Sequence, residues 1–229
     1  ILKEKYKGSC KLFSDFASVS LVNAKIRANI KYDYTCYDIE GNEINNSLFD
    51  IINKSDKVMI TSPHPDDDVL GVGGTMKLLS KTNGLTNPEE QVSIVYMTNG
   101  IGGLSTNVRG AETLRINEAV NAVGCVGYRP SQVVDGTMPF YRTQNREISA
   151  YDVIEAEKIL NKHEPNHIFI CCCPDPKKTH IKCLNILQNC KMPDSVKHIW
   201  LYKSAWEGFK HNESNVEIIF DDETLERKK

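Results

Sequence analysis

The sequence lacks the features of several common protein classes. No stretch of its 229 residues approaches the roughly 18 consecutive apolar residues of a membrane-spanning helix. The formal net charge is only −2, from 28 basic and 30 acidic residues. The composition therefore offers no electrostatic reason to expect binding to nucleic acid or to an anionic membrane surface. We expect a small-molecule partner, no nucleic acid and no membrane span.

Paired cysteine spacings are also missing. The eight cysteines do not follow the pattern of a disulfide framework or a zinc finger. Cys171, Cys172 and Cys173 are consecutive in an apolar run, and we interpret them as small buried side chains that alternate between the faces of a strand. Reduced thiols are typical of the cytoplasm, which is the location we predict.

What is present is a regular alternation of two patterns from residue 57 onward. Short β-branched runs predict strands, and amphipathic stretches between them predict helices. Gly124 is expected to end the second helix. The expected strands are 57–61, 91–98, 131–134, 166–173 and 197–203, and the expected helices are 72–82, 110–123, 149–162 and 180–190. This order predicts an α/β, Rossmann-like fold of three layers with a largely parallel sheet.

The first 50 residues are less regular. We predict that residues 1–50 are a connector or N-terminal segment and that residues 51–229 form the main domain. The chain opens on Ile1 rather than Met, and its last residues resemble the middle of a helix. These ends predict that the sequence is a piece of a longer protein.

Polar residues follow each of the five expected strands. Ligands of parallel sheets bind outside the carboxyl ends of the strands, so we expect the functional site there. Directly after the first strand come His64, Asp66 and Asp67. Burying so many ionisable groups is costly unless a metal or a substrate compensates them.

The His64–Asp67 segment suits a metal ion. Zinc takes imidazole nitrogen and carboxylate oxygen, and a catalytic zinc has three protein ligands and a water. A sharp turn at Pro63 and Pro65 lets His64 and Asp67 face one ion, with Asp66 placed to accept a proton. The alternative for either aspartate is a helix N-cap.

The third ligand has two candidates. His180 and Cys183 are one helical turn apart on one face, and either can reach a metal at a neighbouring strand end. A buried structural thiol is an equally good interpretation of Cys183. Gly71, Gly73 and Gly74 depart from the G-x-G-x-x-G order of dinucleotide sites, so we expect them to allow close packing of a helix on the sheet.

His64-Pro65-Asp66-Asp67, followed by Gly73-Gly74-Thr75, resembles the signature of the PIG-L/LmbE-like zinc N-deacetylases. These enzymes have a Rossmann-like fold and remove acetyl groups from N-acetylglucosamine-containing substrates. The resemblance implies a Zn²⁺ cofactor and the following roles: His64 and Asp67 as zinc ligands, Asp66 as general base, Arg115 as active-site arginine and Asp135 as substrate-binding residue.

The family's H-x-x-H pair has only one histidine here. The resemblance matches His180 to the first histidine, which polarises the carbonyl or stabilises the oxyanion, and Cys183 to the second, which is the third zinc ligand. A thiolate in this position adds negative charge and makes the ion a weaker Lewis acid.

Further stretches resemble one branch of the family, in which the deacetylase-like domain follows a glucosamine-6-phosphate deaminase/isomerase domain. They are Ser62–Val69, Met138–Tyr141, Asp175-Pro176 with Thr179-His180, and Trp200–Tyr202 with Ala205-Trp206. We therefore predict a zinc hydrolase that deacetylates an N-acetylglucosamine derivative, such as the 6-phosphate, in amino-sugar metabolism. The alternative is a non-catalytic domain that binds a sugar phosphate or regulates a partner, with a degenerate metal site.

Overall fold

The computed structural model describes ten stretches of the chain. They are residues 10–12, 14–15, 36–37, 43–44, 51–80, 85–103, 110–142, 147–172, 178–204 and 217–218. Asp175, Pro176, Ala205 and Trp206, which contribute to the family resemblance, lie outside these stretches.

A six-stranded parallel sheet forms the centre of the molecule. Its order is β1-β9-β8-β5-β6-β7, and every neighbouring pair is parallel. The strands are β1 (Cys10–Leu12), β5 (Val58–Ser62), β6 (Val92–Tyr96), β7 (Val133–Asp135), β8 (His167–Cys171) and β9 (His198–Tyr202). Two short pairs are separate from it: β2 (Ser14–Asp15) with β10 (Glu217–Ile218), and β3 (Cys36–Tyr37) with β4 (Glu43–Ile44).

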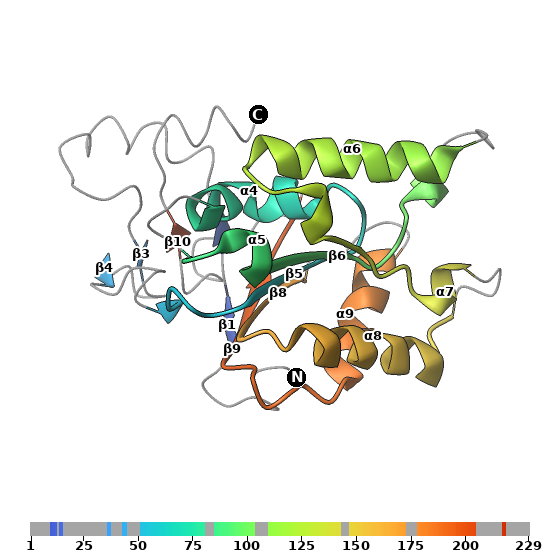
Figure 1. The fold of residues 1–229 in the computed structure, drawn as a ribbon. Coiled ribbons are helices and arrows are strands. Elements are labelled where there is room, and N and C mark those ends of the chain that lie inside the picture. The colour runs from blue at the N-terminus through green and yellow to red at the C-terminus, as the bar shows by residue number, and fades with distance from the viewer. Residues whose placement is uncertain are drawn as a thin grey trace.

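Helices cover both faces of the sheet. Figure 1 shows α4 and α6 on one side and α8 and α9 on the other. Their bounds are α4 (Asp67–Ser80), α6 (Ala111–Cys125), α8 (Ala150–His163) and α9 (Thr179–Asn189), and shorter pieces are α5 (Pro88–Gln91), α7 (Pro139–Arg142), η1 (Ile101–Gly103) and η2 (Pro130–Gln132). The predicted α/β fold of three layers is confirmed.

The core is divided by the sheet into two apolar clusters. Val72 and Val123 belong to one, and Leu160 and Ile186 belong to the other. All residues of β5, β6 and β8 are buried, because helices cover both faces of these central strands. This is why the strands appear in the sequence as continuous apolar runs rather than as alternating ones. None of the helices in the described stretches is both long and apolar enough to cross a membrane.

Several expected boundaries are wrong. Helix α4 begins at Asp67, not at residue 72, and has non-helical angles at Val72 where two helical pieces join. Helix α6 continues to Cys125, so Gly124 lies inside it, and the left-handed residue that follows is Gly127, with φ 102°. Strand β1, within the segment predicted to be a connector, pairs with β9 at the sheet edge.

The strand order creates a crevice at the carboxyl end of β5. From β5 the chain moves outward through β6 to β7, and it then returns to the other side of β5 to form β8 and β9. The loops after β5 and β8 therefore leave the sheet on opposite faces, at the point where open α/β sheets bind ligands. The residues after these two strands are His64–Asp67 and His180.

Candidate functional site

The turn after β5 is held by hydrogen bonds from its own residues and from the neighbouring strand. The Ser62 hydroxyl donates to the carbonyl of His64 at 2.6 Å. The Thr98 hydroxyl, after β6, donates to the carbonyl of Pro63 at 2.7 Å. The backbone N–H of His64 donates to Asp67 Oδ2 at 3.0 Å. These contacts place the imidazole and the carboxylate on the same side of the turn.

His180, from the first turn of α9, completes a compact group with these two residues. Asp67 Oδ2 lies 3.1 Å from His64 Nδ1 and 3.0 Å from His180 Nε2, and the two nitrogens are 3.0 Å apart. Asp67 and His180 are buried, and His64 is partly exposed. Among the described residues these three form the group of histidine, cysteine and acidic side chains that can hold a metal ion.

The carboxylate of Asp67 is held ionised. Burial by itself would raise its pKa, but hydrogen bonds from His180, His64 and Ser204 outweigh burial and hold the pKa well below its usual range. Ser204, after β9, donates its hydroxyl to Asp67 Oδ1 at 2.6 Å. Ser204 belongs to the polar segment expected after this strand, although no role in the site was predicted for it from the sequence. A buried anion with one oxygen facing two imidazoles suits a cation.

Behind His180 lies a thiol. The Nδ1 atom of His180 is 3.8 Å from the sulfur of Cys171, the last residue of β8. One nitrogen of the His180 imidazole, Nδ1, thus lies near the Cys171 sulfur, and the other, Nε2, lies near the Asp67 carboxylate. Cys171 is buried in the core, which confirms the interpretation of this cysteine as a small buried side chain.

The structure places Cys183 in the apolar core. It is buried on α9 within the apolar cluster between the sheet and α8, together with Met59, Leu160 and Ile186. It is not a member of the three-residue metal-type group found among the described residues. His180, one turn earlier, reaches His64 and Asp67 instead. Of the two candidates for the third ligand, the geometry of the described residues favours His180, and the choice between them stays a proposal.

The three-residue group fits zinc. Donor atoms around a tetrahedral zinc at about 2.0–2.1 Å lie about 3.3–3.4 Å apart. The three atoms here, two imidazole nitrogens and one carboxylate oxygen, are separated by 3.0–3.1 Å and need to move only slightly to hold the ion. Three protein ligands leave a fourth position for water or substrate, as in catalytic rather than structural zinc sites.

Asp66, which precedes Asp67 in the chain, pairs with an arginine. Arg115, on α6, places Nη2 3.2 Å from Asp66 Oδ2 and Nη1 2.9 Å from Glu118 Oε2. Burial alone would lower the pKa of Arg115, but the two carboxylates outweigh burial and raise it. Its Nε is buried and has no hydrogen-bond partner among the described residues. A Cβ at Gly100 would lie 2.8 Å from Pro65 and 3.0 Å from Arg115, so glycine permits this approach.

Asp68, to which the sequence assigned no role, is a structural support. It is fully buried and accepts a hydrogen bond from the Tyr96 hydroxyl at 2.9 Å. Its backbone N–H donates to the Ser62 hydroxyl at 3.1 Å. Burial raises the pKa of Asp68 to about 7, although the hydrogen bond from Tyr96 opposes this shift.

Gly71, on the next turn of α4, packs against Tyr202. A Cβ at Gly71 would lie 2.5 Å from the Tyr202 ring, as expected for close packing of the helix on the sheet.

Asp135 also lies at the carboxyl ends of the strands. It is exposed at the end of β7, and its Oδ1 accepts the backbone N–H of Thr137 at 2.9 Å. The next residue, Gly136, donates its N–H to the carbonyl of Tyr96 at the end of β6. The structure thus places Asp135 outside the metal-type group but at the same carboxyl ends of the strands.

Known proteins resemble both the sequence and the fold. Residues 58–191 match the family described as PIG-L: GlcNAc-PI de-N-acetylase. A putative glucosamine-6-phosphate deaminase-like protein of Bacteroides thetaiotaomicron is 24% identical to the chain over 76% of its length. The aligned part is 34% of that protein, so the chain spans about a third of the length of this relative.

Two solved structures show the same fold. The N,N'-diacetylchitobiose deacetylase of Pyrococcus horikoshii has a TM-score of 0.50 and 21% identity, covering 84% of this chain and 72% of that one. The conserved protein TT1542 of Thermus thermophilus has a TM-score of 0.50 and 18% identity, covering 68% and 69%. At these identities the likeness concerns the fold alone. The family match, in contrast, spans more than half of the chain and includes the turn after β5 and the start of α9. The chain belongs to the PIG-L family.

Proposed function

We propose that this protein is a zinc-dependent N-deacetylase that hydrolyses the acetamide of an N-acetylglucosamine derivative. One observation carries the proposal: Asp67 Oδ2, His64 Nδ1 and His180 Nε2 meet within 3.0–3.1 Å at the carboxyl ends of the strands, in a chain of the PIG-L family. The N-deacetylases named in the family description and among the structural neighbours support the reaction class.

His64, Asp67 and His180 would hold the metal. Zinc, when bound, polarises a carbonyl and lowers the pKa of an attacking water. The negative charge of Asp67 would offset part of the ion's charge, and the Ser204 hydroxyl holds the second oxygen of Asp67 by a hydrogen bond. The Cys171 sulfur lies next to His180 Nδ1, and Nε2 is the nitrogen that faces His64 and Asp67 and would bind the ion.

Asp66 is the proposed general base. It lies in the chain between the proposed ligands His64 and Asp67, and its carboxylate is partly exposed. In the hydrolysis it takes a proton from the attacking water and returns it to the departing amine, which yields acetate and the free amino sugar. Arg115 fixes the orientation of Asp66 through their 3.2 Å ion pair. Arg115 and Asp135 are proposed to hold hydroxyl groups of the sugar.

The geometry suggests a different alignment of the H-x-x-H pair. If His180 is a metal ligand, it corresponds to the second histidine of the family pattern rather than the first. The first position then falls on Lys177, three residues earlier. Lys177 lies outside the described residues. In this alignment Cys183 needs no role in the metal site and serves as a packing residue of the apolar cluster.

The finer details of the substrate and the parent protein are part of the proposal. The name of the Bacteroides relative supports a connection with glucosamine-6-phosphate, and the greater length of that relative is compatible with a fused deaminase-like domain. A cytoplasmic role in amino-sugar metabolism is also part of the proposal. N-acetylglucosamine-6-phosphate is therefore one substrate to test. Among the site residues Arg115 is the cation suited to a phosphate, and its guanidinium already contacts both Asp66 and Glu118.

The test combines metal analysis with acetate release. We expect the purified protein to contain about one zinc per chain and to release acetate from N-acetylglucosamine or a derivative. The Asp66→Asn variant should keep the zinc but lose about 10²–10⁴-fold in rate, because it lacks the proton acceptor. Asp194→Asn, at an exposed aspartate of a surface turn, is the matched control and should behave as wild type. A metal-free protein, or full activity in Asp66→Asn, contradicts the proposal.

A non-catalytic sugar-binding domain is the second candidate. It is favoured by one observation: in neither alignment does the chain carry both histidines of the H-x-x-H pair, since the residues are Lys177, His180 and Cys183. This candidate predicts sugar binding without acetate release. The same experiment distinguishes the two.

A further inference from the structure

Helix α6 carries three charged residues at intervals of three: Glu112, Arg115 and Glu118. Residues at this spacing are neighbours on the surface of a helix. Glu112 Oε1 accepts a hydrogen bond from the side-chain amide of Asn99, after β6, at 3.1 Å. Arg115 reaches across to Asp66, after β5, and Glu118 holds Arg115. The proposed function assigns no part to Glu118, although Glu118 belongs to this line of contacts.

Arg115 is the link between Glu118 and Asp66. The guanidinium is planar, and its nitrogens have a fixed arrangement. Nη1 donates to Glu118 Oε2 at 2.9 Å, and Nη2 donates to Asp66 Oδ2 at 3.2 Å. Contacts at two different nitrogens fix the rotation of the plane, which one contact alone does not. Among the described residues Arg115 is the hydrogen-bond partner of the Asp66 carboxylate, so a group that holds Arg115 also holds Asp66.

The loop after β6 restricts the other end of the guanidinium. A Cβ at Gly100 would lie 3.0 Å from Nε and 3.2 Å from Nη2 of Arg115, and 2.8 Å from Pro65. The side chain of Arg115 is only 20% exposed, whereas those of Asp66 and Glu118 are 46% and 49% exposed. The loop thus restricts Arg115 at Nε and Nη2, and Glu118 restricts it at Nη1. Removal of the Glu118 carboxylate therefore frees the Nη1 end.

A role in stability alone does not account for this ion pair. Exposed ion pairs between residues three or four apart on a helix contribute little to stability. Glu155 and Lys158 on α8 form such a pair at 2.7 Å, and no third charged side chain pairs with either of them among the described residues. Arg115, in contrast, also contacts a carboxylate from a different element, and that carboxylate belongs to the proposed base.

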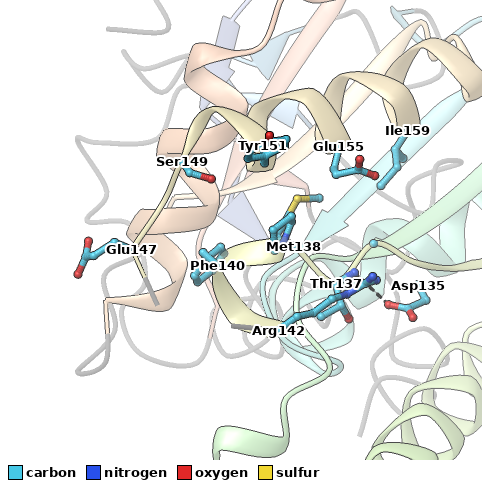
Figure 2. A pocket seen from close by; sticks show the side chains of 12 residues that line it. Asp135, Thr137, Met138, Phe140, Arg142, Glu147, Ser149, Tyr151, Glu155 and Ile159 are labelled. Carbon is cyan, nitrogen blue, oxygen red and sulfur yellow. Dashed lines mark hydrogen bonds between the residues drawn. The ribbon is translucent and has the colours of Figure 1, made fainter. Parts of the chain in front are cut away.

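Asp135, the other residue proposed to hold the sugar, is not part of this arrangement. It lines a cavity between α7 and α8, together with Glu155 of α8 (Figure 2). Asp66, Arg115 and Glu118 are not among the residues that line this cavity. A change at Glu118 therefore bears on Arg115 and Asp66 and leaves Asp135 in place.

We propose that Glu118 is a positioning residue: through Arg115 it holds the Asp66 carboxylate in the orientation required for proton transfer. The inference rests on the proposed function, in which Asp66 is the general base, and adds a residue that does not touch the substrate. Because Arg115 occupies Oδ2 of Asp66, Oδ1 is the oxygen left for the proton of the attacking water. A catalytic group that is free to turn spends less time in the reactive geometry, which lowers the rate.

The kinetics of acetate release provide the first test. Glu118→Ala removes the acceptor for Nη1, so we expect kcat to fall by about tenfold while the zinc content and the urea midpoint stay those of the wild type. Glu118→Gln should restore most of the rate, because its amide oxygen still accepts from Nη1. A fall in kcat no larger than that of the control, a change in KM alone, or loss of zinc in Glu118→Ala overturns the inference.

Glu89→Ala is the matched control. Glu89 also pairs with an arginine, with 2.6 Å between its Oε1 and Arg129 Nη2, and its side chain is 47% exposed, close to the 49% of Glu118. It lies on α5, which precedes β6 at the amino ends of the strands, away from the candidate site. We expect kcat, KM and zinc content of this variant to equal those of the wild type.

Nitrogen NMR of the Arg115 side chain tests the contacts without turnover. Separate Nη signals indicate a guanidinium that is held at both nitrogens, and a single averaged signal indicates free rotation. We expect separate signals in the wild type and in Glu89→Ala and an averaged signal in Glu118→Ala, with Arg115→Lys used for the assignment. Separate signals that persist in Glu118→Ala mean that Asp66 holds Arg115 without Glu118, and they overturn the inference.

The outcomes separate this inference from the proposed function. If the wild type releases no acetate but the Arg115 signals average in Glu118→Ala, the positioning arrangement stands and the hydrolase proposal fails. If the wild type releases acetate and Glu118→Ala has the rate of the control, only this inference fails.

Discussion

Two histidine–aspartate clusters lie at opposite ends of the parallel sheet. At the carboxyl ends, Asp67 meets His64 and His180. At the amino ends, Asp56 precedes β5 and lies 3.0 Å from His167, the first residue of β8. Both aspartates are almost completely buried, and hydrogen bonds outweigh burial to hold the pKa of each well below its usual range. A list of residue types does not distinguish the two clusters.

The hydrogen bonds of the two clusters do distinguish them. Oδ2 of Asp56 accepts both N–H groups of Asn53 at 3.0 Å and faces His167 Nε2, and Oδ1 accepts Lys197 Nζ at 2.7 Å. The other nitrogen of His167 accepts Trp200 Nε1–H at 3.2 Å. Donors thus satisfy the cluster from several sides. In the His64–Asp67–His180 group, by contrast, three atoms of the kinds that ligate metals lie within 3.0–3.1 Å of one another, and no lysine or arginine pairs with Asp67 among the described residues. Three such atoms at one point indicate a cation site, whereas an aspartate paired with a lysine, as Asp56 is, indicates a structural cluster.

The largest expected effect is at the carboxyl-end group. Asp67→Asn removes the anionic ligand, so we expect zinc to be lost and acetate release to fall by about 10³-fold or more. Metal analysis and a coupled acetate assay measure this. Asp56→Asn is the matched change at the other end and should leave the zinc content unchanged. Zinc loss in both variants would remove the distinction between the clusters.

The amino-end cluster should matter for stability instead. Asp56→Ala leaves the N–H groups of Asn53, His167 and Lys197 without their acceptor. We expect the free energy of unfolding to fall by about 3–5 kcal/mol, as measured by urea denaturation. Asp194→Ala, at an exposed aspartate, is the control. A drop no larger than that of the control would show that the cluster is not structural.

The pH dependence of stability should report on His167. Burial lowers its pKa to about 4, against the raising effect of Asp56. The unfolded chain binds this proton near pH 6.5 and the folded chain only near pH 4, so stability is present above pH 6.5 and is lost as the pH falls toward 4. The loss amounts to about 3 kcal/mol. Denaturation of wild type and His167→Gln at about pH 4.5 and 7 should show a smaller pH effect in the variant; equal effects contradict the assignment.

The smallest effect is expected at Cys183. If His180 is the third ligand, Cys183→Ala should keep the full zinc content and lose only about 1 kcal/mol of stability from the apolar cluster. Cys190→Ala, a buried cysteine of the same cluster, is the matched control. His180→Ala should lose zinc. Zinc loss in Cys183→Ala, with zinc kept in His180→Ala, restores the ligand set predicted from the sequence.

The sequence was sufficient for the fold because its signals are local and repeated. Continuous apolar runs mark strands buried on both faces, and the five expected strands are all present within a few residues. The start of a helix was harder to predict where the same residues belong both to the candidate site and to the helix. Asp67 and Asp68, interpreted as part of a ligand loop, also form the first turn of α4, where negative charge is favourable. Ser204 could not be assigned, because its contact with Asp67 crosses 137 positions of the chain.

The sequence by itself determined that His64 and Asp67 belong to one site, because they lie three residues apart in a single turn. It also placed that turn at the end of a buried strand of a parallel sheet. Only the tertiary structure shows that His180, and not Cys183, lies with His64 and Asp67 among the described residues. Helical periodicity puts both on one face of α9, but which of them lies at the strand end depends on where along its axis the helix packs on the sheet. That position is set by residues distant in the chain, such as Met59 and Leu160, which belong to the same apolar cluster as Cys183.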